Sequence, residues 1–240
     1  MRRITCLPYA ALVPAPLPLF PLNTPLVPGL VLPLHIFEHR YREMVEELLA
    51  RPDEDDREFG IVAVRDGRDV AADGLPALYP VGTATVLRQA ERLDDGRYDI
   101  VTTGSRRFRL LGIDTRHPLL RAEVEYLDDV SDPADALLAE QVTRRFRLYR
   151  DALSGQVPDA ADGDDPDDDA ELPDDPTVLS YLVTAAMLLP TDERQGLLAA
   201  ATTGDRLVLA RSLLGRETAL ISTLSAVPSL DVPGVPPSVN

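Results

Sequence analysis

The first half of the chain alternates short apolar runs with turn-forming residues, a pattern typical of β-strands. Prolines within the first runs favour extended or edge strands and disfavour helix. Asp95-Gly96 is a hairpin signal, and Gly104-Ser105 interrupts a long run as a bulge or bend does. We predict strands at residues 59–64, 81–91, 98–111 and 119–126, an edge strand or extended segment at residues 17–22, and a short extended run at residues 30–36.

One helix interrupts this β-rich half. Apolar residues between Tyr41 and Leu49 stand at helical spacing, with charged residues between them. The pattern predicts an amphipathic helix that ends before Arg51-Pro52, because the residue before a proline disfavours helical backbone. Closely spaced strands with one inserted helix predict a small closed or partly closed barrel.

The second half has helical spacing from Asp132 onward. One helix is predicted over residues 136–153, and later helices begin after Asp175, near Pro190 and near Thr203. Asp175 suits an N-cap, with Pro176 at the first helical position. The predicted α+β chain has an extension at 1–14, a β-barrel subdomain at 15–127, a helical subdomain at 128–226 with an acidic loop at 156–175, and a loose tail at 227–240.

The charged residues narrow the possible functions. All 24 basic residues are arginine, so a phosphate-binding P-loop, a Ser-Lys dyad and a Schiff-base lysine are excluded. The formal net charge of −16 repels phosphate backbones at long range. Binding to nucleic acid or to an anionic membrane is therefore disfavoured.

The amino-terminal region contains one cysteine and a long uncharged stretch. Cys6 is the only cysteine of the chain, so no intrachain disulfide forms, which fits a reducing cytosol. No charged side chain occurs between Arg3 and Glu38, but repeated prolines exclude a membrane-spanning helix and interrupt a signal sequence. We expect a cytoplasmic protein.

Several candidate sites have ordinary alternatives that we favour. His35, Glu38 and His39 could hold a metal ion, but His35 precedes the helix, so turn and capping roles are favoured. Cys6 with His35 has no third group for a nucleophilic site, and Ser105 lacks the Gly-x-Ser-x-Gly context. The acidic loop lacks the order of an EF-hand, so we interpret it as a solvated loop and expect neither metal nor cofactor.

Several separated motifs resemble the amino-terminal domain of Lon proteases. The longest is LPLFPLNTPLVPGLVLPLHIFEHRYREMV at residues 17–45, although His39 stands where the family usually has proline. Further matching motifs are Gly82-Thr83, DGRY at 95–98, TGSRRF at 103–108, DERQGLL at 192–198 and Arg206-Leu207. The resemblance spans residues 17–224 and implies a PUA-like β-barrel followed by a helical bundle.

The same resemblance implies a substrate-recognition and assembly module. In full-length Lon proteases an ATPase and a Ser-Lys peptidase follow this domain, and we expect neither activity here. We therefore predict a non-catalytic protein that binds unfolded or partner polypeptides. One version of this hypothesis makes it an accessory to a separate protease. The rival hypotheses are a PUA-like RNA-binding protein and, last, an unrecognised enzyme.

The candidate contact residues follow from these two binding hypotheses. Exposed apolar patches commonly mark polypeptide binding, and we expect an apolar groove between the β-rich and helical parts, with Phe20, Phe37 and Tyr41 as candidates. Arg106, Arg107 and Arg109 could contact an anion or a partner, with a solvated strand face paired with acids as the alternative. The lack of interleaved aromatic residues disfavours stacking of RNA bases there.

Overall fold

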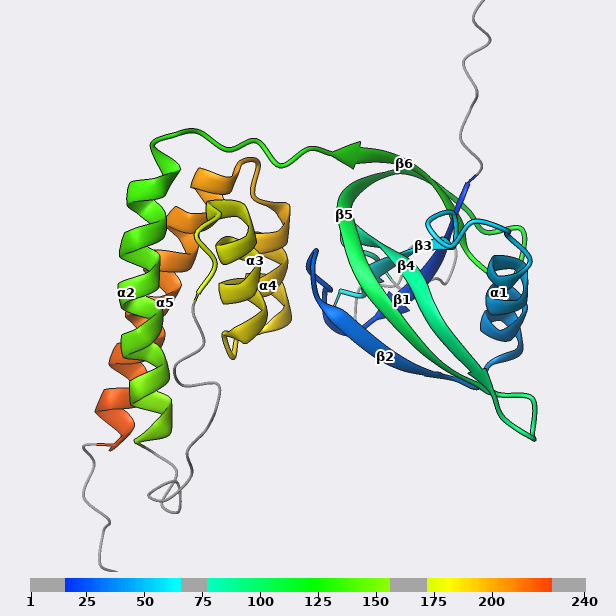
Figure 1. Ribbon diagram of the computed structural model, residues 1–240, viewed down its shortest axis with the longest axis horizontal. Coiled ribbons are helices and arrows are strands. Elements are labelled where there is room, and N and C mark those ends of the chain that lie inside the picture. Colours follow the sequence, from blue (N-terminus) through cyan, green and yellow to red (C-terminus); the bar gives the residue numbers. More distant parts are fainter. Residues whose placement is uncertain (1–15, 66–76, 156–171, 226–240) are drawn as a thin grey trace, which may run out of the picture. The chain divides into compact units, whose positions relative to one another are not determined.

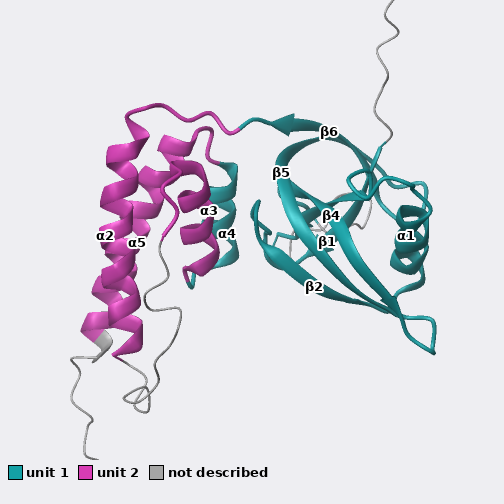
Figure 2. Ribbon diagram, viewed as in Figure 1, with its two compact units in different colours: residues 1–128, 188–199 teal, residues 129–187, 200–240 magenta. Residues whose placement is uncertain are grey.

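The structure, a computed structural model, describes residues 16–65, 77–155 and 172–225 (Figure 1). These residues form six strands and five helices, so the α+β prediction is confirmed. The chain divides into two compact units: unit 1 comprises residues 1–128 and 188–199, and unit 2 comprises residues 129–187 and 200–240 (Figure 2). The predicted extension, the tail and most of the acidic loop lie outside the described residues.

The elements of unit 1 are β1 (Leu17–Leu22), β2 (Val31–Ile36), α1 (His39–Leu49), β3 (Glu58–Ala63), β4 (Val81–Arg92), β5 (Tyr98–Asp114), β6 (Arg121–Leu127) and α4 (Thr191–Ala199). Those of unit 2 are α2 (Asp135–Ser154), α3 (Pro176–Ala186) and α5 (Thr203–Ser225). Each predicted strand and helix is found, with ends that differ by a few residues.

The six strands form one sheet in the order β2-β5-β4-β3-β1-β6, and β5 also pairs with β6. The pairings β5–β4–β3–β1–β6–β5 therefore close a circuit, and β2 is added outside it along β5. All pairs are antiparallel except β1 with β3. Ala84 pairs with Arg106 and Thr85 with Gly104, which leaves Ser105 as the extra residue of the predicted bulge.

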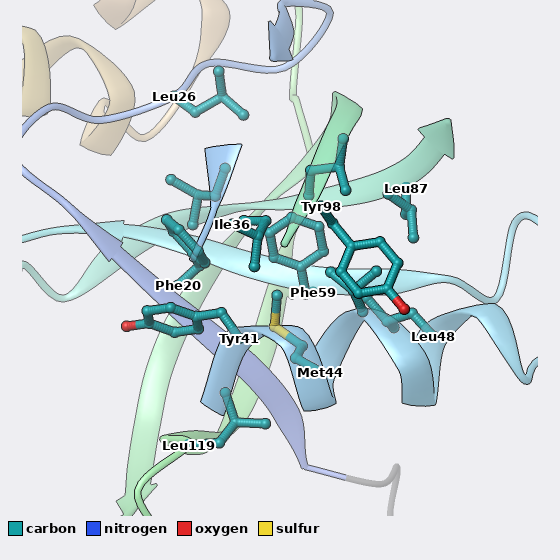
Figure 3. Packing of buried hydrophobic residues seen from close by; sticks show 13 residues of the cluster. Phe20, Leu26, Ile36, Tyr41, Met44, Leu48, Phe59, Leu87, Tyr98 and Leu119 are labelled. Atoms are coloured by element: carbon teal, nitrogen blue, oxygen red, sulfur yellow. The ribbon is translucent and has the colours of Figure 1, made fainter. Parts of the chain in front are cut away.

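Helix α1 covers one side of the sheet core. Its buried residues are Tyr41, Met44, Val45 and Leu48, at the spacing of one helix face. Figure 3 shows the side chains of Tyr41, Met44 and Leu48 on this helix. They pack with Phe20 and other strand side chains in one cluster. Full burial of one such side chain stabilises the fold by about 1.5–3 kcal/mol, so this stripe holds α1 on the sheet.

Two glycines admit a buried ring on the other side of the sheet. Phe108 of β5 is fully buried with Leu17 and Leu19. A Cβ atom at Gly60 or at Gly82 would lie within 3.0 Å of the Phe108 ring. The neighbouring strands β3 and β4 therefore need glycine where this ring crosses them.

Helix α4 is joined to the sheet of unit 1 by polar side chains. The Gln195 amide donates to the Val81 carbonyl oxygen at 2.8 Å, and Thr191 donates to the Asn23 carbonyl. Arg107 of β5 donates to the Leu198 carbonyl at 3.0 Å, near the carboxyl end of α4, where the helix dipole favours a cation. The sequence pattern assigns residues 191–199 to the helical subdomain, and the domain boundaries at 15–127 and 128–226 stay a prediction.

Unit 2 is built around a buried arginine. Arg206 of α5 is fully buried, pairs with Asp129 at 2.9 Å and lies over the ring of Tyr181, 4.0 Å from its centroid.

Asp175 accepts from two backbone N–H groups at the start of α3, so the predicted N-cap is confirmed. No helix among the described residues is long and apolar enough to span a bilayer.

Candidate functional site

The strands β2, β5 and β4 present one solvent-facing surface, which we call the outer face. Pro33 lies opposite Val101, which lies opposite Gln89. His35, Asp99 and Glu91 form the next row. Directly opposite residues of paired strands share a face, so these two rows lie side by side. The intervening residues, such as Leu34 and Ile100, belong to the core cluster or pack against it.

The outer face has a shallow hollow with an apolar border. A cavity of about 520 Å³ is lined by Pro33, His35, Gln89, Asp99, Val101 and their neighbours on the three strands. Val31, the first residue of β2, is 56% exposed, and Leu30 and Phe37, which flank the strand, are 40% and 62% exposed. The Phe37 ring stacks on the His35 ring, with centroids 6.5 Å apart. This arrangement places Phe37 beside the hollow.

A polar network fixes His35 at the border of the hollow. Its Nδ1 atom lies 2.6 Å from an Asp99 carboxylate oxygen, and its Nε2 atom lies 3.0 Å from Nη1 of Arg97. Arginine only donates, so Nε2 accepts and Nδ1 carries the proton that it donates to Asp99. Asp95 accepts from Arg97 at 2.6 Å, and the hydrogen bond to the backbone of Arg97 lowers the pKa of Asp95. The network holds the imidazole ring against Phe37.

The free edge of β2 also presents backbone groups. Among the described residues β2 pairs with β5 alone. The Gly104 N–H donates to the Leu30 carbonyl, so in an antiparallel ladder Leu32 and Leu34 also bond to β5. Val31, Pro33 and His35 then direct their backbone groups outward. Pro33 has no N–H to offer, which limits strand addition at this edge.

The three apolar candidates from the sequence lie in different surroundings. Phe20 and Tyr41 are buried, with ring centroids 4.3 Å apart, inside the core cluster (Figure 3). Burial raises the pKa of Tyr41. Phe37 is the member of the three that solvent reaches. A binding role for these residues, and a groove between the two parts of the chain, stay predictions.

The three arginine candidates are all engaged with the protein. Arg107 is buried and donates to backbone carbonyls. Arg106 lies over the Tyr126 ring at 3.4 Å and close to Glu58, while Arg109 donates to Glu125 at 2.7 Å. Their positions match the expected alternative of a strand face paired with acids, except for the burial of Arg107. Anion contact by these residues stays a prediction.

The candidates for metal binding and nucleophilic chemistry lie apart. His35 faces Asp99, His39 lies 3.4 Å from Glu43, and Glu38 pairs with Arg40. Within the described ranges no group of three or more His, Cys, Asp or Glu residues could hold a metal ion. The Ser105 hydroxyl donates to the Ala84 carbonyl within the bulge. Cys6 lies outside the described residues.

Sequence reasoning missed most of the outer face. The sequence places Val31, Pro33 and Val101 in extended segments, but a segment that is apolar on both faces does not show which side meets solvent. The available signal was parity: His35 and Asp99 are charged or polar, and Val31 and Pro33 share the parity of His35. Alternate residues of a strand share one face, so a face that carries His35 is expected to meet solvent, together with Val31 and Pro33.

Comparison with known proteins gives a consistent family match. The model of the ATP-dependent protease La (LON) substrate-binding domain matches residues 16–216. Lon protease of Anaeromyxobacter dehalogenans is 26% identical over 90% of this chain and 25% of its own length. Lon protease 2 of Syntrophobacter fumaroxidans is 30% identical over 78% of this chain and 22% of its own length. The chain thus spans about a quarter of the length of the curated relatives it matches.

Solved structures show the same fold. The Lon N-terminal domain protein from Xanthomonas campestris superposes with a TM-score of 0.57 at 25% identity, over 84% of this chain and 98% of that chain. The N-terminal domain of the Mycobacterium avium complex Lon protease gives the same TM-score at 16% identity, over 85% of this chain and 98% of that chain.

Proposed function

The chain belongs to the LON substrate-binding domain family, and from that premise we propose that it binds unfolded or partner polypeptides without ATPase or peptidase activity of its own. The family description supports substrate binding. The absence of lysine supports the second part of the proposal, because a Ser-Lys dyad and a P-loop both require that residue. A cytoplasmic location is part of the same proposal.

We also propose that the closed circuit of strands is a PUA-like barrel. The circuit β5–β4–β3–β1–β6–β5 supports a barrel because it leaves no free edge among those five strands. Strand β2 lies outside the circuit and adds a surface to it. In this proposal the barrel is the scaffold and β2 carries the contact surface.

The observation that carries the proposed function is the apolar border of the outer face. Val31 and Phe37 are large apolar side chains that are more than half exposed, beside a hollow of about 520 Å³. Exposed apolar surface next to a hollow gives an unfolded chain a place to bury its own apolar side chains. The limited backbone edge at Pro33 makes side-chain contact the main source of affinity.

The test compares two matched substitutions. Phe37→Ser and Leu111→Ser each remove an apolar side chain of unit 1 with nearly equal exposure, 62% and 64%. Leu111 lies on β5 beyond the segment that pairs with β2, so it serves as the control. Affinity for a fluorescein-labelled, reduced and carboxymethylated polypeptide is measured by anisotropy.

We expect Phe37→Ser to weaken binding roughly fivefold to thirtyfold, because burial of an aromatic side chain contributes about 1–2 kcal/mol at a partly exposed site. Leu111→Ser should bind as the unchanged chain does. Equal affinities for all three proteins would contradict the outer face as the contact surface.

A further inference from the structure

Helix α2 carries a concentration of arginines that contrasts with the charge of the chain. Residues 140–151 contain four arginines and two acids, in a chain of formal net charge −16. Arg144 and Arg145 are exposed, and no carboxylate pairs with either within the described ranges. Exposed arginines in an acidic protein usually find carboxylates, as Arg88 and Arg109 do here.

Two of these arginines line a groove with α5. The groove has a volume of about 690 Å³ and is lined by Gln141, Arg144, Arg145, Leu148 and Arg211, residues that we call the arginine groove. Helices α2 and α5 lie side by side in unit 2 (Figures 1 and 2). At 3.6 residues per turn, the four α2 residues of the groove fall on one face of that helix.

The α5 wall of the groove is shaped around a guanidinium group. A Cβ atom at Gly215 would overlap the Arg145 guanidinium, so glycine allows that side chain to lie across α5. Arg211 donates to the Gln141 amide oxygen, a neutral partner that leaves its charge uncompensated. Three positive charges therefore meet at one groove without a carboxylate among the described side chains that line it.

The groove also has an apolar contact point. Leu148 is 59% exposed at its border, and Leu137, three turns before it on the same face of α2, is 65% exposed. A ligand that satisfies the whole surface needs carboxylates for the arginines and an apolar side chain for Leu148. Phe146 and Tyr149 are buried, so no aromatic ring at the groove is open for stacking of nucleic-acid bases.

We propose that the arginine groove is a docking site for an acidic polypeptide segment that carries apolar side chains. Guanidinium groups pair with carboxylates through two parallel hydrogen bonds, so the contact is specific in its geometry as well as favourable in its charge. The site lies wholly within unit 2 and does not rest on the outer face of unit 1. The chain then binds two kinds of polypeptide segment, apolar at one surface and acidic at the other.

The test uses the full chain and two short fluorescein-labelled peptides. One peptide is composed of Asp, Leu and Gly, and the other has Asn in place of every Asp. The variant is Arg144→Gln/Arg145→Gln, and the control is Arg147→Gln, an exposed arginine of the same helix that does not line the groove. Binding is measured by anisotropy at physiological ionic strength, where charges beyond about 8 Å are screened, and circular dichroism checks that each variant is folded.

We expect the Asp peptide to bind and the Asn peptide to bind at least roughly tenfold more weakly. The double variant should weaken binding of the Asp peptide by about threefold to tenfold, from two exposed ion pairs, and Arg147→Gln should change it less than twofold. Equal binding of the two peptides, or an unchanged affinity in the folded double variant, would overturn the proposal. Binding of a labelled oligouridine in preference to the Asp peptide would also overturn it.

Discussion

Substitution of Gly82 by alanine tests how closely the strands of unit 1 approach one another. A Cβ atom at Gly82 would lie 2.6 Å from the Ile61 carbonyl oxygen and 2.5 Å from the Phe108 ring, where ordinary contact begins at 3.4 Å. The carbonyl belongs to a paired strand and cannot move without breaking the pairing of β3 with β4. We expect Gly82→Ala to lower the free energy of unfolding by about 2 kcal/mol, within the usual range for an overpacked core.

Gly60 provides the matched comparison. A Cβ atom there would lie 2.9 Å from side-chain atoms of Leu17 and Phe108, and no backbone atom is among its nearest neighbours. Side chains yield more easily than a strand, so Gly60→Ala should cost about 1 kcal/mol. A third variant, Gly112→Ala, meets nothing within 4 Å at a position without positive φ, and should be neutral or stabilising by about 0.5 kcal/mol.

The assay is urea unfolding followed by far-ultraviolet circular dichroism, in single variants and in combination with Phe108→Leu. The smaller side chain should couple favourably with Gly60→Ala, because it removes the clash with the ring. It should leave most of the cost of Gly82→Ala, since the Ile61 carbonyl remains. The reasoning is refuted if Gly82→Ala unfolds at the urea concentration of the unchanged chain, or if Phe108→Leu restores both alanine variants equally.

Three further outcomes are expected. Arg206→Met should lower the free energy of unfolding by about 1.5–3 kcal/mol, measured by urea unfolding, because it removes the charged hydrogen bond from the buried guanidinium to Asp129; a loss below about 0.5 kcal/mol would contradict this role. Asp175→Ala should cost about 1 kcal/mol in the same assay through the lost N-cap, and no change in midpoint would speak against the cap. Burial and the hydrogen bond to Glu58 raise the pKa of Tyr126 to about 12. Its contribution to stability is therefore present below pH 10 and is lost between about pH 10 and 12. Ultraviolet titration should show late tyrosinate formation, and Tyr126→Phe should reduce it by one tyrosine.

Local sequence patterns predicted the elements because each pattern has a direct physical cause. Tyr41, Met44 and Leu48 share one face only if the segment is helical, and in the structure these three side chains are buried on one face of α1. Gly104-Ser105 indicated a bulge correctly. Ser105 is the extra residue of β5, and a Cβ atom at the neighbouring Gly104 would lie 2.6 Å from the Val27 carbonyl oxygen, so the backbone there needs glycine. Asp175-Pro176 marked a helix start for equally local reasons.

Long-range features could not be predicted in the same way. Arginine is normally an exposed residue, so nothing in the sequence distinguishes the buried Arg107 and Arg206 from their exposed neighbours. Arg107 is held by a carbonyl of α4 that is 91 residues away, and the grouping of α4 with unit 1 depends on such contacts. The arginine groove needs the pairing of α2 with α5, which helical periodicity alone does not specify.

The most direct test of the central claim is an anisotropy titration of the full chain with labelled, reduced and carboxymethylated polypeptide, alongside labelled RNA at several salt concentrations. Burial of apolar surface depends little on salt, whereas neutralisation of phosphates makes nucleic-acid affinity fall steeply as salt rises. We expect saturable binding of the polypeptide that changes little with salt, and no comparable binding of RNA. Binding of RNA alone, lost as salt rises, would contradict the account.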